Sequence, residues 1–282
     1  MIDIRQTSQY ANYLKNIGWE VERVENVNYF IKKIPVLGSV LKVQRPERLR
    51  LQTIQSLANK HRSFQVIIEP KDRPDADLLI SAGYKLSRSP YLPTKTLRLD
   101  IELSNTRLLK NMQKDARAAI SKNAETKIKS SDPNINTTYN HNNIQYTIGG
   151  FRGAWKDAVG LKRYVPPLSH LINLKKAFKE NCLFELAEDK SAGAIYLTRG
   201  LVAYYWQAFT NKHGRKTLAQ YKIVWKGMLW SKARGAKVFD FEGIYDERFP
   251  QKSWLGFSHF KKSFGGEVLE YPGAFTKIGF RL

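Results

Sequence analysis

The alternation of apolar and polar residues predicts short helices and strands mixed along the whole chain. In residues 7–18, apolar side chains recur at helical spacing and Gly18 follows them, which predicts a short amphipathic helix that ends there. Residues 19–35 carry valines among polar residues and predict one or two strands. Residues 63–70 form a β-branched run that a proline ends, which predicts another strand, and a helix is expected between them over 47–62.

An amphipathic helix is predicted over residues 105–125, which follow an extended stretch interrupted by two prolines. Its apolar face consists of Leu108, Leu109, Met112, Ala116, Ala119 and Ile120. Its other face carries a basic stripe of Lys110, Lys114 and Arg117. This stripe is either a surface that meets phosphates or an ordinary solvated helix face.

The second half of the chain repeats this mixture of elements. Helices are predicted near 150–158, over 167–181 and over 217–234, the last with Thr217 as its N-cap and Gly235 at its end. The strands predicted there are LFELAED, GAIYLTRGLVAYYWQAFT and AKVFDFEG.

Strands followed by helices, twice over, predict an α/β protein with mixed (α+β) sheets and two lobes. Residues 123–147 are rich in Asn, Ser and Thr and have little apolar periodicity, which is typical of a linker or surface excursion. We therefore expect a first lobe over 1–122, with the amphipathic helix that begins at residue 105 as its hinge helix, and a second lobe over 148–282.

Charge changes the picture, because 47 Lys and Arg against 25 Asp and Glu give a formal net charge of +22. Such a field attracts polyanions, so nucleic acid, an anionic membrane face and a diphosphate substrate all fit, and simple solubility is the plain alternative. The single cysteine, Cys182, excludes an internal disulfide and suits a reducing cytoplasm. No signal peptide or transmembrane run is apparent, so we expect a cytoplasmic protein.

Motif searches exclude several enzyme classes. The five histidines have no metal-ligand spacing, and the chain has no GxSxG elbow, P-loop or GxGxxG. We therefore expect no metal site and no cofactor.

The C-terminal block is the most informative stretch. It contains Phe239–Ile244 (FDFEGI), then Phe260–Gly266 (FKKSFGG), then Tyr271–Gly273 (YPG). These elements resemble the C-terminal signature of the Fem family (FemABX), the aminoacyltransferases that build peptidoglycan interpeptide bridges. The opening helix, the strand FQVIIEP and the stretch 87–122 resemble the family in the same order, so the resemblance covers nearly the whole chain.

The resemblance implies two tandem GNAT-like lobes and no long coiled-coil insertion, because no stretch here has the required length or heptads. It also implies transfer of an amino acid from aminoacyl-tRNA to the stem peptide of a peptidoglycan precursor, either lipid II or UDP-MurNAc-pentapeptide. Peripheral contact with the inner membrane face is consistent with the lipid-linked precursor.

The resemblance further indicates candidate residues. Phe260 and Lys261 match the family's Phe-Lys pair, so Lys261 is expected to stabilise negative charge at the ester and Phe260 to stack on a terminal base; a solvated helix lysine is the alternative. Lys15 and Arg163 fall near positions where the family uses basic residues to bind the precursor diphosphate. Glu69 stands at an acidic position that either holds the acceptor amine or is structural.

Three aromatic residues and one carboxylate complete the expected site. Tyr204, Tyr205 and Trp206 lie on a predicted strand, with core packing as the alternative for at least one of them. Asp240 is expected to share a strand face with Glu242, as a substrate contact or as a strand-end cap.

Two other functions remain open from the sequence. One is a GNAT-type N-acyltransferase using acyl-CoA, although no glycine-rich pyrophosphate loop is present. The other is a non-enzymatic RNA-binding module, which the charge and the interleaved aromatics would suit.

Overall fold

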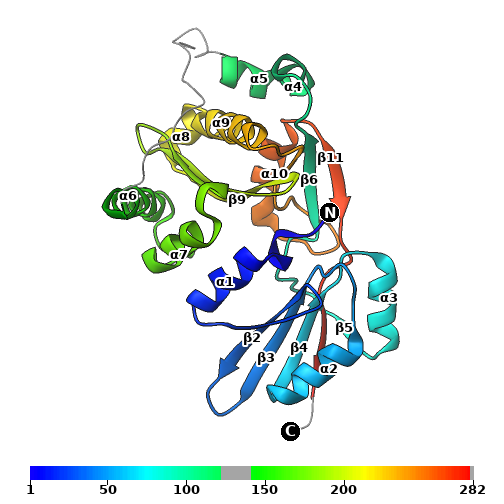
Figure 1. Cartoon of the computed structure of the whole chain (residues 1–282). Helices are drawn as coiled ribbons and strands as arrows, with labels where there is room; N and C mark the ends of the chain where they lie inside the picture. The colour runs from blue at the N-terminus through cyan, green and yellow to red at the C-terminus, as the bar shows by residue number, and fades with distance from the viewer. Residues whose placement is uncertain (122–140, 280–282) are drawn as a thin grey trace. The chain divides into compact units, whose positions relative to one another are not determined.

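The computed structural model describes residues 1–121 and 141–279, and within them the chain forms a mixed α/β protein with two six-stranded sheets (Figure 1). Contacts divide the chain into two compact units, each described here by itself. Unit 1 comprises Met1–Thr96, Tyr245–Lys252 and Leu269–Leu282, and unit 2 comprises Leu97–Ile244 and Ser253–Val268. This division differs from the expected lobes because the C-terminal third of the chain contributes to both units.

The first sheet has the strand order β1-β2-β3-β4-β12-β5. Its strands are β1 (Glu20–Val24), β2 (Val27–Ile34), β3 (Gly38–Gln44), β4 (Ser63–Glu69), β12 (Phe275–Ile278) and β5 (Lys85–Leu86). Its helices are η1 (Ile4–Gln6), α1 (Ser8–Asn16), α2 (Leu51–Lys60) and α3 (Arg73–Ser81). The core beneath the sheet is formed mainly by β-branched and aromatic residues of β2, β3 and β4, together with α2 and α3.

Local chemistry explains several of the unit 1 elements. The Thr7 hydroxyl accepts a hydrogen bond from the Tyr10 amide at 3.2 Å and caps α1, and Gly18 follows the helix with φ +85°, as the sequence predicted. Residues Val66 to Glu69 of β4 are all buried, because β3 and β12 flank the strand in the sheet and α2 packs against it.

The second sheet has the order β11-β6-β10-β9-β8-β7. Its strands are β6 (Lys95–Asp100), β7 (Cys182–Leu186), β8 (Ala192–Arg199), β9 (Val202–Thr210), β10 (Val238–Asp240) and β11 (Glu267–Glu270). The helices of this part are α4 (Asn105–Asn111), α5 (Lys114–Ser121), α6 (His141–Val159), α7 (Leu168–Phe178), η2 (Lys179–Asn181), α8 (Lys212–Lys216), α9 (Ala219–Ala233), η3 (Lys252–Trp254) and α10 (Leu255–Lys262).

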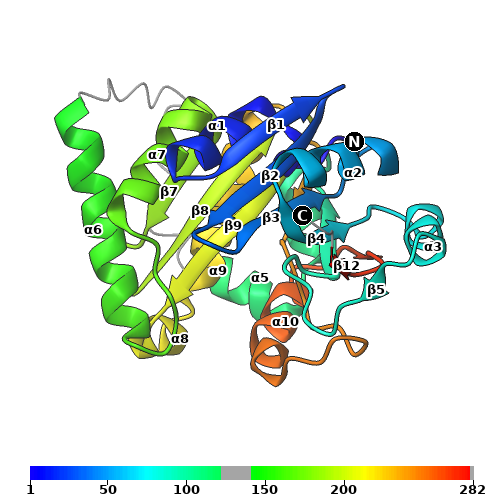
Figure 2. The same ribbon diagram turned by 90° about the horizontal axis from the view of Figure 1, so that it is seen from below.

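Helices cover both faces of strands β7, β8 and β9. Helix α9 lies on one face, where the Tyr196 hydroxyl donates to the Ile223 carbonyl at 2.8 Å. Helices α6 and α7 lie on the other face (Figure 2), where the Phe151 ring of α6 contacts Phe184 and Phe209. The aromatic side chains of β8 and β9 therefore fill a core on each side of the sheet.

Strands β9 and β10 pair in parallel only as far as Tyr204 opposite Asp240. Strand β9 continues to Thr210, whereas the chain leaves β10 through Glu242 at φ +54° and Gly243 at φ +122°. The two parallel strands thus part at the carboxyl end of β10, an arrangement that often forms ligand sites in α/β sheets.

The structure corrects the prediction of a single helix over 105–125. Helix α4 ends at Asn111, Met112 is extended with ψ 154°, and α5 begins at Lys114. The Gln113 amide donates to the Ser263 carbonyl at 2.8 Å, so a tertiary contact takes the place of a helical hydrogen bond. The predicted apolar face is otherwise right: Leu108, Met112 and Ile120 are buried.

The predicted start of the helix over 217–234 is also wrong. Thr217 donates its hydroxyl to the His213 carbonyl at 3.1 Å and closes α8, which Asn211 caps. Helix α9 begins after Leu218, which has a left-handed backbone conformation and is exposed. Gly235, with φ +78°, follows the helix end as predicted.

Most of the linker predicted over 123–147 lies outside the described residues, although residues 141–147 form the first turns of α6. The lobe limits 1–122 and 148–282 stay a prediction. Among the described residues, no helix is long and apolar enough to cross a membrane, and no group of acidic, histidine or cysteine side chains is arranged to hold a metal ion.

Candidate functional site

Lys261 is a buried lysine at the place where β9 and β10 part. Helix α10 carries it, and its side chain is only 8% exposed. Its Nζ donates to the Phe241 carbonyl at 2.7 Å and to the Gly243 carbonyl at 2.6 Å. It also lies 5.5 Å from the Tyr205 ring centroid and 4.9 Å from that of Phe257. The alternative of a solvated helix lysine therefore does not fit this geometry.

Burial sets the charge state of this lysine. Desolvation by burial, with a smaller contribution from the Arg163 charge, lowers the pKa of Lys261 from its ordinary value of 10.5 to about 7. The carboxylates of Glu242 and Asp240 act in the opposite direction but do not offset the burial. At neutral pH the amine therefore populates both its protonated and its neutral form.

Asp240 fixes the chain just after β10. Its Oδ2 accepts a hydrogen bond from Arg98 Nε at 2.8 Å, and its Oδ1 accepts one from the Glu242 amide at 2.8 Å. The second contact is a local cap of the strand end, one of the two roles expected for this residue. Glu242 lies beyond the strand, so it does not share a β-face with Asp240 as the alternation predicted. Arg98, the partner of Asp240 on β6, was not among the predicted site residues.

Tyr205 is the aromatic residue of β9 that faces Lys261. It is 7% exposed, and its hydroxyl accepts a hydrogen bond from Gln220 Nε2 at 2.7 Å. Burial raises the pKa of Tyr205, so its hydroxyl stays protonated at neutral pH. Gln220 lies on the first turn of α9 and was not among the predicted site residues, because the pattern of apolar residues around it predicts a helix but not its contact with Tyr205.

Arg163 lies in the loop between α6 and α7 and is exposed. Its Nη1 donates to the Ala208 carbonyl of β9 at 3.2 Å, and its charge acts on both Tyr205 and Lys261. Unit 2 thus brings four of the predicted residues into one electrostatic neighbourhood, namely Arg163, Tyr205, Asp240 and Lys261.

The other aromatic predictions differ in their surroundings. Tyr204 is 2% exposed and Trp206 is partly buried. The β8–β9 register moves from Ile195 opposite Gln207 to Tyr196 opposite Tyr205, so Trp206 is the extra residue of a bulge. The bulge alters the alternation of β9 beside the place where it parts from β10.

Phe260 is packed within unit 2. Its ring centroid lies 4.8 Å from that of Tyr221 and 5.3 Å from that of Phe264, both edge to face. The ring is partly buried against the core of the unit. Its expected stacking on a nucleotide base stays a prediction.

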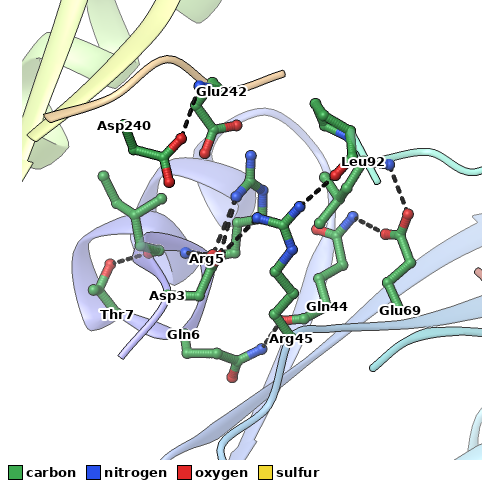
Figure 3. A network of polar contacts seen from close by, with 12 residues as sticks. Asp3, Arg5, Gln6, Thr7, Gln44, Arg45, Glu69, Leu92, Asp240 and Glu242 are labelled. Carbon is green, nitrogen blue, oxygen red and sulfur yellow. Dashed lines mark hydrogen bonds and ion pairs between the residues drawn. The ribbon is translucent and has the colours of Figure 1, made fainter. Parts of the chain in front are cut away.

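The two remaining predicted residues belong to unit 1. Lys15 is exposed on the last turn of α1. Glu69 is buried at the end of β4, where one carboxylate oxygen accepts from the Leu92 amide at 2.6 Å and the other from Gln44 Nε2 at 2.8 Å (Figure 3). These contacts give Glu69 a structural role in unit 1, which was one of its two expected roles.

Unit 1 also holds a buried ionic group that the sequence did not indicate. Asp3 lies between Arg5 and Arg45, at 3.1 Å and 3.3 Å, and all three side chains are buried (Figure 3). Burial alone would raise the pKa of Asp3, but the two guanidinium groups hold it below its usual value. Arg45 also stacks at 3.5 Å on the Tyr271 ring and donates to the Pro93 carbonyl, which ties the N-terminal segment to the C-terminal one.

Comparisons with known proteins find a family model that matches part of the chain. The FemAB family model matches residues 172–279. A search of curated proteins finds no match.

Among solved structures, the fold is similar to the crystal structure of FemX, with 15% identity, coverage of 98% of this chain and 92% of that chain, and a TM-score of 0.74. It is similar to the C-terminal domain of a putative lysylphosphatidylglycerol synthetase from Agrobacterium fabrum, with 11% identity, coverage of 98% and 89%, and a TM-score of 0.57. It also resembles a tandem GNAT protein from the clavulanic acid biosynthesis pathway, with 10% identity, coverage of 93% and 83%, and a TM-score of 0.51.

The Fem family resemblance and the α/β class with tandem GNAT-like lobes are thereby confirmed. The FemAB match over residues 172–279 and the similar folds together support a transferase of the acyltransferase class.

Proposed function

We propose that the chain is an aminoacyltransferase that moves an amino acid from aminoacyl-tRNA to the stem peptide of a peptidoglycan precursor, with Lys261 at the reacting ester. The observation that carries the proposal is the buried amine held by the Phe241 and Gly243 carbonyls where β9 and β10 part. The FemAB match over 172–279 includes this lysine and supports the reaction class.

The reaction defines what this amine must do. A primary amine of the stem peptide attacks the ester carbonyl, a C–N bond forms, and the carbonyl oxygen becomes an oxyanion. The intermediate then expels the ribose oxygen, which takes up a proton, while the attacking nitrogen loses one. Catalysis consists of placing the two substrates together and stabilising the oxyanion.

The geometry of Lys261 suits this task. An ammonium group has three N–H donors, and two of them are bound by backbone carbonyls. Within the described residues, the remaining donor is available for an oxyanion, and its direction is set by the other two bonds. Because the pKa of Lys261 is about 7, the same group is also able to give a proton to the leaving ribose oxygen.

The first experiment is single-turnover transfer from radiolabelled aminoacyl-tRNAs to lipid II and, separately, to UDP-MurNAc-pentapeptide. We expect label in the precursor and a loss of about 10²- to 10³-fold in the Lys261→Met variant, which is the usual effect of removing one oxyanion donor. Lys262→Met is the matched control, because Lys262 is the adjacent lysine of α10 and is exposed. Equal rates in the two variants would remove Lys261 from the mechanism.

The same assay separates the proposal from its alternatives. Phosphatidylglycerol is included as an acceptor because one similar structure is that of a putative lysylphosphatidylglycerol synthetase. Acetyl-CoA is included as a donor because another is a tandem GNAT protein. Transfer to phosphatidylglycerol would favour a lipid-modifying aminoacyltransferase, and acetylation would favour a GNAT-type N-acyltransferase. Binding of tRNA without any transfer would favour an RNA-binding module.

Lys15 and Arg163 are proposed to bind the precursor diphosphate. Both are exposed basic side chains, and a charge-assisted contact with phosphate is lost when either is removed. We expect Lys15→Ala and Arg163→Ala each to weaken precursor binding by about tenfold, the effect of about 1.4 kcal/mol, in calorimetry with UDP-MurNAc-pentapeptide. Unchanged affinity in both variants would place the diphosphate elsewhere.

A further inference from the structure

The loop between α6 and α7 exposes apolar and basic side chains together. Leu161 is 104% exposed and Tyr164 is 72% exposed, and Lys162 and Arg163 between them are exposed as well. We call residues Gly160–Val165 the 160–165 loop. Single exposed apolar residues are common on protein surfaces, but a leucine and a tyrosine flanking two cations form a small amphipathic tip.

The loop is held in this shape by its own backbone and by its neighbours. The Gly160 amide donates to the Lys156 carbonyl at 2.8 Å, and Gly160 has φ +54°. Arg163 bonds the Ala208 carbonyl, and Arg152 Nε bonds the Pro166 carbonyl at 2.8 Å. Exposure of Leu161 is therefore built into the loop, because these bonds hold both of its ends against unit 2.

The charge around the loop is mainly positive. Residues 156–179 contain one acidic residue, Asp157, against Lys156, Lys162, Arg163, Lys175, Lys176 and Lys179. This local excess belongs to a chain whose formal net charge is +22. A neutral or basic protein surface would not complement it, whereas an anionic one does.

We propose that the 160–165 loop docks on the surface of an anionic phospholipid bilayer, with Leu161 and Tyr164 entering the interface and Lys162 and Arg163 meeting the headgroups. A tyrosine suits the boundary between headgroups and acyl chains, and lysine and arginine near it are attracted to anionic lipid. RNA would engage the two cations but would gain little from Leu161. The pairing of apolar with basic side chains therefore favours lipid over RNA.

Docking would bring the candidate site to the membrane. Arg163 belongs to the loop, and its charge acts on Tyr205 and Lys261. A lipid-linked acceptor would then reach this site without leaving the bilayer. Lipid docking does not rest on the proposed transfer reaction, because it is measured without tRNA or precursor.

The test uses an environment-sensitive fluorophore at position 161. Cys182 is the single cysteine of the chain and is buried, so the Leu161→Cys variant carries one accessible thiol for labelling. With vesicles of phosphatidylcholine containing phosphatidylglycerol, we expect a blue shift of the emission, and little shift with phosphatidylcholine alone. The matched control is a label in Ile80→Cys, because Ile80 is 52% exposed on α3 near Asp75 and Asp77.

Vesicle co-sedimentation of unlabelled variants completes the test. We expect Leu161→Ser to weaken binding by about tenfold and Lys162→Gln by about fivefold, while Ile80→Ser binds as the wild type does. Thermal unfolding confirms that each variant is folded. Three results would overturn the proposal: no shift at position 161, a shift caused by tRNA instead of vesicles, or a shift that rises with protein concentration alone, which indicates self-association.

Discussion

At the residue scale, the protonation state of Lys261 affects both the stability of the fold and the expected rate of transfer. The pKa of Lys261 is about 7 in the folded protein, against an ordinary value of 10.5. Between these two pH values the amine is mostly neutral in the folded protein and mostly protonated in the unfolded chain. Folding then releases a proton between about pH 7 and 10.5. The same shift therefore has one consequence for stability and another for the rate.

The stability consequence has a definite sign. Above pH 7 the unfolded state binds more protons at this site, so the free energy of unfolding rises with pH, by about 1.4 kcal/mol per unit for one group, and levels off near pH 10.5. Below pH 7 the site adds no slope. We expect urea unfolding from pH 6 to 10 to show this gain in the wild type relative to Lys261→Met, with the other titrations cancelling in the difference. Parallel curves for the two proteins would mean that Lys261 keeps an ordinary pKa.

The pH dependence of the transfer rate tests whether catalysis needs the positive charge of Lys261. If the ammonium form stabilises the oxyanion, the wild-type rate divided by that of Lys261→Arg falls about tenfold per pH unit above pH 7, because arginine stays charged. Single-turnover transfer measured across this range tests the ratio. A ratio that does not change with pH would show that protonation of Lys261 is not needed in the transition state.

At the element scale, two helical glycines allow the effect of side-chain packing on stability to be separated from the effect of helix propensity. A Cβ at Gly227 of α9 would lie 2.2 Å from Cζ of the buried Tyr196 ring, whereas a Cβ at Gly153 of α6 would meet nothing within 4 Å. We expect Gly227→Ala to destabilise the protein by about 1–3 kcal/mol through overpacking. Gly153→Ala should stabilise it by up to about 1 kcal/mol through helix propensity. Thermal unfolding of both variants checks the pair, and stabilisation by Gly227→Ala would mean that the sheet and α9 pack less closely.

The elements also show what a sequence pattern can predict. Local patterns identified α1, α2, β4 and α9. The helices present an apolar face to a core, with Gly18 after α1 and Gly235 after α9, and β4 is a β-branched run that Pro70 ends. The patterns missed the break after α4, where no glycine or proline interrupts the pattern and the Ser263 carbonyl, far along the chain, takes the Gln113 amide. They also extended β10 beyond Asp240, since the positive φ of Glu242 has no signature in local composition.

The candidate site also contains residues that the sequence predicts and residues that only the structure reveals. The Phe-Lys pair was found because a family signature marks it, yet its burial depends on carbonyls of residues 241 and 243 that no local pattern connects to position 261. Gln220 and Arg98 act by contacting Tyr205 and Asp240 from other elements. Partners of this kind arise only from the tertiary fold.

At the scale of the whole molecule, the chain returns to its first sheet at the end. Strand β12 lies between β4 and β5, with Phe275 opposite Ile68 on one side and Leu86 on the other. Phe275 and the adjacent Ala274 are 3% and 0% exposed. Unit 1 is therefore incomplete without the last residues, although the linker composition of 123–147 favoured a simple division into consecutive lobes.

This interleaving leads to a prediction about fragments. A fragment of residues 1–122 lacks β12, so β4 would expose one hydrogen-bonding edge and the apolar residues that Phe275 covers. We expect it to be unfolded or aggregated by circular dichroism and size-exclusion chromatography. Addition of a synthetic peptide of residues 269–282 should restore a cooperative thermal transition, whereas the same peptide with Phe275→Asp should not. A 1–122 fragment that folds on its own would instead favour two consecutive lobes, with β12 only an addition to the first.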